Sequence, residues 1–128
     1  MSAQPTSRIL ICDDEEVLRS LVRATLDDAR YEIVEAEDGD ESIELARSLK
    51  PDVILLDMMM PGRTGLEVLE LLRADPELSR TPVVMLTARA RVSDRDAAVA
   101  AGADRYLAKP FSPLELIGVV EELLDSAA

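Results

Sequence analysis

Residues 51–62 read PDVILLDMMMPG and contain four consecutive aliphatic residues before Asp57. A run of this kind, with no polar residue at alternate positions, predicts a strand that is covered on both faces, as in a parallel sheet. Similar apolar runs occur at residues 9–12 and 83–86. The sequence therefore predicts three central strands of one parallel sheet.

Amphipathic stretches, in which apolar residues recur at the spacing of one helix face, separate these strands. Helices are predicted at residues 15–28, 39–49, 66–72, 92–101 and 112–125, with Ser112 as the N-cap of the last and Gly102 ending the fourth. Residues 31–36 are more polar and suit an edge strand, and residues 105–108 form a short fifth strand. Side chains expected to face the core are Leu18, Leu21, Val22 and Leu26 in the first helix and Ile117, Val120 and Leu124 in the fifth. Five βα units predict an α/β fold, a doubly wound parallel sheet with helices on both faces.

Length and composition limit the classes of function. The chain has 128 residues, 48% of them hydrophobic, which suits a single domain over residues 1–128 with its core at about 8–125. Its 14 basic and 26 acidic residues give a net charge of −12, so direct binding to nucleic acid is not expected. With no His and one Cys, a His-based catalytic triad, a Cys/His zinc site and a disulfide framework are excluded. No apolar run approaches the roughly 20 residues of a membrane span, and residues 1–7 are polar, so a cytoplasmic protein without membrane contact is expected.

Polar side chains follow four of the five predicted strands. Asp13 and Asp14 follow the first strand, Asp57 the third, Thr87 the fourth and Lys109 the fifth. Because ligands bind beyond the carboxyl ends of such strands, we expect these residues to converge. Clustered carboxylates repel one another unless a cation intervenes, and oxygen ligands without His or Cys suit Mg²⁺. With a lysine and a hydroxyl beside them, they are typical of phosphoryl transfer to a carboxylate.

Each of these residues also has an ordinary structural interpretation. Asp13 or Asp14 suits the cap of the first helix, and Asp57 suits a turn after an apolar strand. Thr87 suits the N-cap of the fourth helix, and Lys109 suits the protein surface. Their joint occurrence at four strand ends favours a functional site over these separate explanations.

The chain resembles the receiver domain of two-component response regulators, of which the chemotaxis response regulator is the single-domain example. The resemblance covers about residues 8–124 and rests on ILICDDE at 9–15, PDVILLDMMMPG at 51–62, Gly65, PVVMLTA at 82–88, GAD at 102–104 and KPF at 109–111. It implies a flavodoxin-like receiver fold with five helices and five strands in the order 2-1-3-4-5.

The resemblance also implies roles for individual residues. Asp57 would be the phosphoacceptor, taking a phosphoryl group from the phosphohistidine of a sensor histidine kinase or from a phosphotransfer protein. Asp14 and Asp57 would bind Mg²⁺ directly, Asp13 would act through a bound water, and the backbone carbonyl of Met59 would supply a further ligand.

Three residues of the last two βα units complete the site that the resemblance implies. Thr87 would hydrogen-bond the aspartyl phosphate and Lys109 would pair with it. Tyr106 would be a switch that turns inward once Thr87 moves toward the phosphate, although it also suits an ordinary half-buried strand tyrosine. The Lys109–Pro110 peptide is usually cis in such proteins.

The function expected on this basis is a signalling switch that catalyses only its own phosphorylation and dephosphorylation and is otherwise not an enzyme. It would regulate a downstream protein target through the surface of the fourth helix, fifth strand and fifth helix. Arg105, Val119 and Glu121 depart from the pattern of receivers that dimerise through this surface, so association with a different protein is expected. The charged patch expected to change on activation comprises Arg89, Arg91, Arg95, Arg105 and Glu115.

Three alternatives remain open from the sequence. A nucleotide- or flavin-binding enzyme on a similar sheet would need a glycine-rich phosphate loop, and no such loop follows any strand. A degenerate receiver would bind partners without phosphate. The chain also suits a receiver domain cut from a larger regulator with a DNA-binding or enzymatic output domain.

Overall fold

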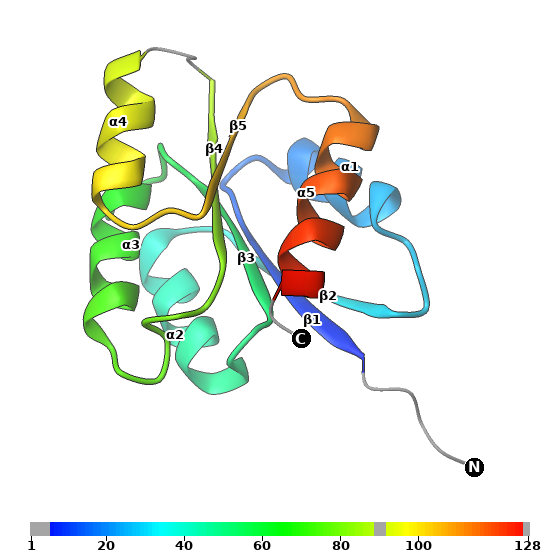
Figure 1. The fold of residues 1–128 in the computed structure, drawn as a ribbon, viewed down its shortest axis with the longest axis horizontal. Helices are drawn as coiled ribbons and strands as arrows, with labels where there is room; N and C mark the ends of the chain where they lie inside the picture. Colours follow the sequence, from blue (N-terminus) through cyan, green and yellow to red (C-terminus); the bar gives the residue numbers. More distant parts are fainter. Residues whose placement is uncertain (1–5, 89–91, 127–128) are drawn as a thin grey trace.

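The computed structural model describes residues 6–88 and 92–126, with residues 92–95 and 126 described by their backbone alone. Strands and helices alternate along this part of the chain (Figure 1). In chain order they are β1 (Ser7–Cys12), α1 (Glu16–Thr25), β2 (Tyr31–Ala36), α2 (Gly39–Leu49), β3 (Val53–Asp57), α3 (Gly65–Ala74), β4 (Val83–Thr87), α4 (Val92–Ala100), β5 (Arg105–Ala108) and α5 (Pro113–Ser126).

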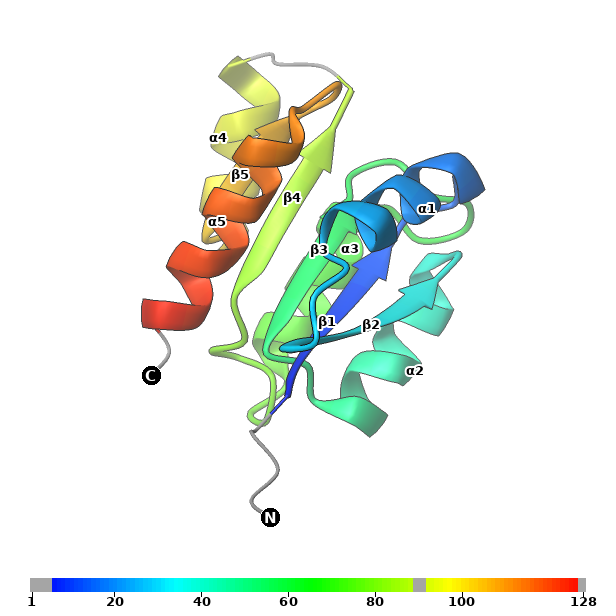
Figure 2. The ribbon, with the colours of Figure 1, turned by 90° about the vertical axis from the view of Figure 1, so that its right-hand side faces the viewer.

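The strands form one parallel sheet between two layers of helices. Their order is β2-β1-β3-β4-β5, and every neighbouring pair is parallel. Helices α2, α3 and α4 pack on one face of the sheet, and α1 and α5 pack on the other (Figures 1 and 2). The predicted doubly wound fold is therefore confirmed.

The central strands are apolar throughout because they are buried on both faces. Side chains alternate across a strand, so Leu55 of β3 packs toward α1 and α5, whereas Ile54 and Leu56 pack toward α2 and α3. Every residue of β3 and β4 is buried. At the sheet edge, β2 has only one fully buried residue, Ala36, which agrees with its more polar sequence.

Several helix ends follow the predicted caps. Ser112 Oγ accepts a hydrogen bond of 3.1 Å from Glu115 N, and the Glu115 carboxylate accepts one of 3.2 Å from Ser112 N. Gly102 follows α4 with a φ of 103°, a conformation that favours glycine. Among the residues that the structure describes, no helix combines the length and apolar composition that crossing a membrane requires.

The predicted core face of α1 is wrong at Leu21, which is 46% exposed. The buried stripe instead runs through Arg19, Val22 and Leu26. The buried Arg19 guanidinium finds hydrogen-bond acceptors at Glu35 and at the Asp13 carbonyl, whereas Leu21, two residues further on, faces the opposite side of the helix. Apolar spacing alone does not reveal a buried arginine.

The predicted core face of α5 is confirmed at Val120 and displaced by one position at Ile117 and Leu124. Leu116, Val120 and Leu123 are buried, whereas Ile117 and Leu124 lie half-buried beside them. This helix carries more apolar residues than one face can bury, so its sequence alone leaves the inward stripe ambiguous.

Candidate functional site

Polar residues at the carboxyl ends of four strands meet at one edge of the sheet. Asp13 follows β1, Asp57 ends β3, Thr87 ends β4 and Lys109 follows β5. Asp13, Asp57 and Thr87 are buried, whereas Asp14 is exposed. The three carboxylates each offer an oxygen within 4.8 Å of the others, and Lys109 forms ion pairs with two of them. The predicted convergence is therefore present in the fold.

Lys109 brings the positive charge of the cluster between two aspartates. Its Nζ lies 2.8 Å from Asp13 Oδ2, 3.3 Å from Asp57 Oδ1 and 3.7 Å from Glu15 Oε1. Burial opposes the charged form of Lys109, but the hydrogen bond with Asp13 and the charge of Asp57 outweigh it and raise the lysine pKa. Lys109 is therefore held protonated inside the cluster, not on the open surface.

Asp13 has both a structural and a site contact. Its Oδ1 accepts a hydrogen bond of 2.9 Å from Glu15 N, which satisfies a backbone donor at the start of α1, while its Oδ2 pairs with Lys109. The N-cap residue itself is Glu15, without a side-chain cap. The two interpretations of Asp13 from the sequence are thus compatible, since each uses a different carboxylate oxygen.

Asp57 is held in an environment that disfavours its charge. Burial and the nearby charge of Asp13 raise its pKa from the ordinary 3.8 to about 6, against the opposing effects of Lys109 and the Met59 N–H. Met59 N lies 3.4 Å from Asp57 Oδ1, so the chain turns back over the carboxylate directly after β3. A buried carboxylate with this pKa is typical of a reactive or metal-binding site.

The donor set fits a hard cation. Three carboxylates within 4.8 Å of one another, with no softer ligand among them, match the oxygen coordination that Mg²⁺ prefers. A cation would also relieve the repulsion that raises the pKa of Asp57. The ligand role of the Met59 carbonyl stays a prediction.

The raised pKa of Asp57 predicts how stability depends on pH without divalent cations. The Asp57 carboxyl has a higher pKa in the folded state than in the unfolded state. Its contribution to stability is therefore fully present at a pH below 3.8 and is lost as the pH rises through about 6. Asp57→Asn removes the titration, so at pH 7.5 this variant should be more stable than the wild type by roughly 2–3 kcal/mol. Urea unfolding in a chelator at several pH values measures this difference.

The same comparison of unfolding free energies at several pH values also shows what would contradict this prediction. The difference in unfolding free energy between Asp57→Asn and the wild type should shrink toward zero as pH falls from about 6 to below 4. Adding Mg²⁺ at pH 7.5 should also shrink it, because the cation stabilises only the charged carboxylate. A difference that does not change with pH would contradict the environment described for Asp57.

Thr87 and Tyr106 lie on neighbouring strands beside the cluster. Thr87 is buried, and its carbonyl accepts a hydrogen bond of 2.6 Å from Lys109 N. Tyr106 pairs in register with Met85 and is half-buried against the α2–α4 side of the core. The peptide between Lys109 and Pro110 is cis, as expected. The switch roles of Thr87 and Tyr106 stay predictions.

Part of the predicted charged patch lies outside the described residues. Arg89 and Arg91 lie outside the described residues, as does the side chain of Arg95, so the expected pairing of Arg95 with Glu115 lies outside them too. Arg105 forms an exposed ion pair with Glu122 of α5. Arg105 is one of the residues expected to depart from the pattern of dimerising receivers, and its charge is paired here within the chain.

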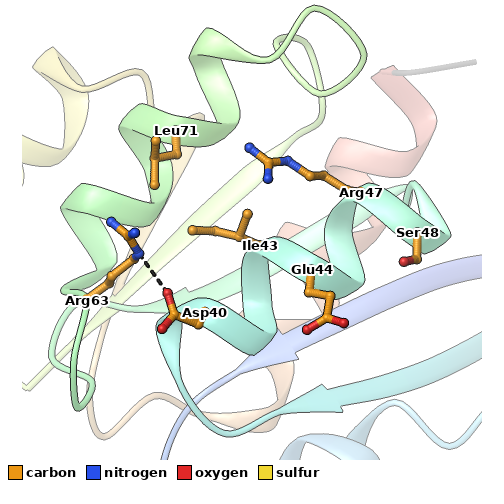
Figure 3. A pocket seen from close by; sticks show the side chains of 7 residues that line it. All are labelled: Asp40, Ile43, Glu44, Arg47, Ser48, Arg63 and Leu71. Carbon is orange, nitrogen blue, oxygen red and sulfur yellow. Dashed lines mark hydrogen bonds and ion pairs between the residues drawn. The ribbon is translucent and has the colours of Figure 1, made fainter.

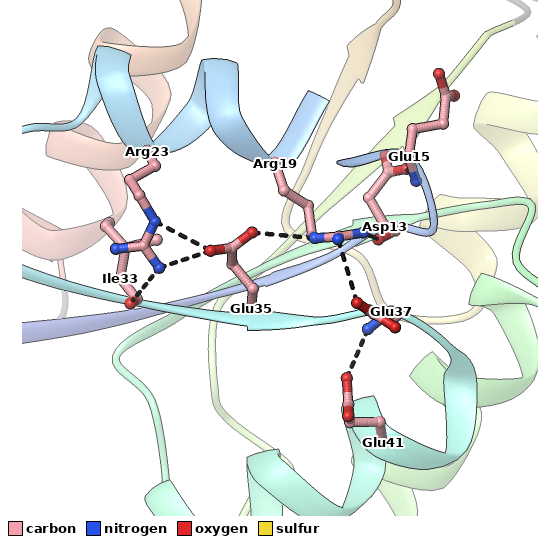
Figure 4. Close-up of polar contacts among 8 residues, drawn as sticks. All are labelled: Asp13, Glu15, Arg19, Arg23, Ile33, Glu35, Glu37 and Glu41. Carbon is pink, nitrogen blue, oxygen red and sulfur yellow. Dashed lines mark hydrogen bonds and ion pairs between the residues drawn. The ribbon is translucent and has the colours of Figure 1, made fainter. Parts of the chain in front are cut away.

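The sequence interpretation missed Arg19 as part of the site. Only 6% of this residue is exposed, and its Nη1 donates a hydrogen bond of 2.7 Å to the carbonyl oxygen of Asp13 (Figure 4). The signal was a basic residue in register with Val22 and Leu26 on the helix, which is unusual for a core face.

A separate hollow of about 410 Å³ lies between α2 and α3 (Figure 3). Three of its four charged lining residues are already in ion pairs, Arg63 with Asp40 at 2.7 Å and Arg47 with Asp75 at 3.4 Å. None of the predicted site residues lines it. The acidic cluster is therefore the better candidate for the chemistry of this fold.

Comparison with known proteins agrees with this geometry. A family model described as the response regulator receiver domain matches residues 9–121. The transcriptional regulatory protein ResD of Bacillus subtilis is 43% identical over 95% of this chain and 50% of its own length. The phosphate regulon transcriptional regulatory protein PhoB of Klebsiella pneumoniae is 41% identical over 91% of this chain and 51% of its own. The chain thus spans about half the length of the curated relatives it matches.

Solved structures share this fold over nearly the whole of their own chains. The chemotaxis protein CheY4 of Vibrio cholerae superposes with a TM-score of 0.87 and 34% identity, covering 93% of this chain and 99% of that one. A putative response regulator from Chloroflexus aurantiacus superposes with a TM-score of 0.89 and 34% identity, covering 95% and 99%.

Proposed function

Because this chain belongs to the family of response regulator receiver domains, we propose that it is a phosphoryl-accepting switch with Asp57 as the acceptor. The donor would be the phosphohistidine of a sensor histidine kinase or of a phosphotransfer protein. The observation that carries the proposal is a buried Asp57 with Lys109 Nζ at 3.3 Å and two further carboxylates within 4.8 Å.

The proposed reaction uses the cluster for positioning and charge neutralisation. An Asp57 oxygen bonds to phosphorus while the bond from phosphorus to the histidine nitrogen breaks, and the leaving imidazole keeps the electron pair. Lys109 stabilises negative charge that develops on the phosphoryl oxygens. Mg²⁺ held by Asp13, Asp14 and Asp57 would supply further positive charge at this point.

The chain would act only on its own Asp57, and otherwise as a regulated binding module in the cytoplasm. Phosphorylation would change the α4–β5–α5 surface and its affinity for a downstream protein. The net charge of −12 argues against direct nucleic-acid contact by these 128 residues. Relatives of twice this length are transcriptional regulatory proteins, which favours, as the alternative, a receiver that controls a DNA-binding output domain.

Binding of beryllofluoride, which mimics a phosphoryl group on a carboxylate, tests the proposal directly. We expect beryllofluoride to raise the melting temperature above the value with Mg²⁺ alone, and to have no effect without Mg²⁺, because the mimic must bond to Asp57 beside a cation. A bound ¹⁹F NMR signal should appear under the same conditions.

The controls are omission of Mg²⁺ and the variant Asp57→Asn, neither of which should give the shift or the signal. A wild-type protein that ignores beryllofluoride with Mg²⁺ would refute the proposed switch. That result would favour a degenerate receiver that binds its partners without phosphate.

A further inference from the structure

Arg19 of α1 places a buried positive charge against the backbone of Asp13, beside the acidic cluster. Its side chain is 8% exposed, and its Nε lies 3.0 Å from Glu35 Oε1 while its Nη2 lies 3.4 Å from Glu37 Oε1. The remaining contact is the hydrogen bond of 2.7 Å from Nη1 to the carbonyl oxygen of Asp13 (Figure 4). One guanidinium thus joins α1, the edge of the sheet and the loop that follows β1.

The contact with Asp13 fixes the orientation of a peptide plane in the site. Asp13 N donates to the Ala36 carbonyl at 3.1 Å, and Arg19 holds the Asp13 carbonyl, which belongs to the peptide leading into Asp14. Within the described part of the chain, no hydrogen bond or ion pair holds the Asp14 carboxylate itself. The orientation of the Asp14 side chain therefore depends on the Asp13–Asp14 peptide, which Arg19 holds in place.

The two acidic residues that accept from Arg19 at the sheet edge make further contacts of different kinds. Glu35 also binds Arg23, whose Nη2 lies 2.7 Å from Glu35 Oε2. The backbone N–H of Glu37 donates to Glu41 Oε1 of α2 at 2.7 Å. Arg19 and Arg23 bind different oxygens of Glu35, so Arg19 is anchored to the sheet edge through a contact of its own.

We propose that Arg19 is a positioning residue for cation binding, acting through the Asp13–Asp14 peptide. The inference rests on the proposed function, because it assigns Arg19 a role toward the cation that the three aspartates would hold. The direction in which Mg²⁺ affinity changes when Arg19 is replaced distinguishes this positioning role from a purely electrostatic effect. Removing a nearby positive charge should strengthen cation binding, whereas releasing the peptide should weaken it.

The test compares Arg19→Met with Arg23→Met, which lies one turn further along α1. Arg23 shares Glu35 and reaches the Ile33 carbonyl at 3.2 Å, but it has no contact with Asp13. Isothermal titration with Mg²⁺ alone should show about tenfold weaker binding for Arg19→Met, and affinity within about twofold of the wild type for Arg23→Met. Arg19→Lys, which keeps the charge without the planar fork, should weaken binding by roughly threefold.

Each outcome bears on the proposal. Circular dichroism establishes that the variants are folded at the titration temperature, and if Arg19→Met is unfolded, Arg19→Lys decides. Mg²⁺ affinity in the folded Arg19 variants equal to or tighter than that of the wild type would overturn the positioning role alone. Absence of Mg²⁺ binding in the wild type would overturn both this role and the proposed function.

Discussion

Replacing Asp57 with asparagine is expected to abolish phosphoryl incorporation from acetyl phosphate in the presence of Mg²⁺. The amide has no carboxylate oxygen to form the acyl phosphate, and Asp57 is the carboxylate that ends the central strand β3, 3.3 Å from Lys109 Nζ. Intact-protein mass spectrometry should show the added phosphoryl group on the wild type and none on Asp57→Asn.

Asp52→Asn is the matched control, because Asp52 lies just before the opposite end of β3. Its carboxylate accepts a hydrogen bond of 2.7 Å from Arg8 N, and the length of β3 separates it from the cluster. This variant should incorporate phosphate as the wild type does. Stable phosphate on Asp57→Asn at the wild-type level would refute the assignment of the acceptor.

Gly65→Ala is expected to destabilise the protein and to disturb the acceptor segment together. A Cβ at this first residue of α3 would meet the carbonyl oxygen of Asp57 and lie 2.8 Å from Met58 Cα, both backbone atoms that cannot turn aside. Separating α3 from the end of β3 should lower the free energy of unfolding by about 3 kcal/mol. It should also weaken Mg²⁺ binding, because Asp57 moves with that backbone. Urea unfolding and Mg²⁺ titration measure the two effects.

Gly118→Ala tests whether this loss comes from the close approach and not from any glycine replacement. Gly118 lies in α5, where an added Cβ meets no atom within 4 Å, so alanine should stabilise the helix by up to about 1 kcal/mol. If Gly65→Ala were as stable as the wild type, the tight packing of α3 against β3 would be contradicted.

Several predicted elements agree with the structure in their bounds. Residues 31–36 and 105–108 form β2 and β5 with the predicted bounds, and α2 spans the predicted residues 39–49. Residues 15–28 are helical only from 16 to 25. The helix ends early because Asp28 takes part in a turn, in which its side chain accepts from Arg30 N at 2.8 Å.

The candidate site was predictable because topology does most of the placement. Once the strands are parallel, residues after them meet at one edge, so Asp13 and Lys109 pair although they lie 96 positions apart. Arg19 was not predictable in the same way. Its acceptors lie on a different element, and apolar periodicity does not record which polar group finds partners.

The sequence by itself determined the parallel α/β sheet and the residues that end its strands, because unbroken apolar runs and their polar ends are local properties of the chain. Only the tertiary structure decided the protonation balance of Asp57, the burial of Arg19 and the close contact of Gly65 with β3. These properties depend on desolvation and on distances between segments far apart in the chain, which exist only after the layers have packed.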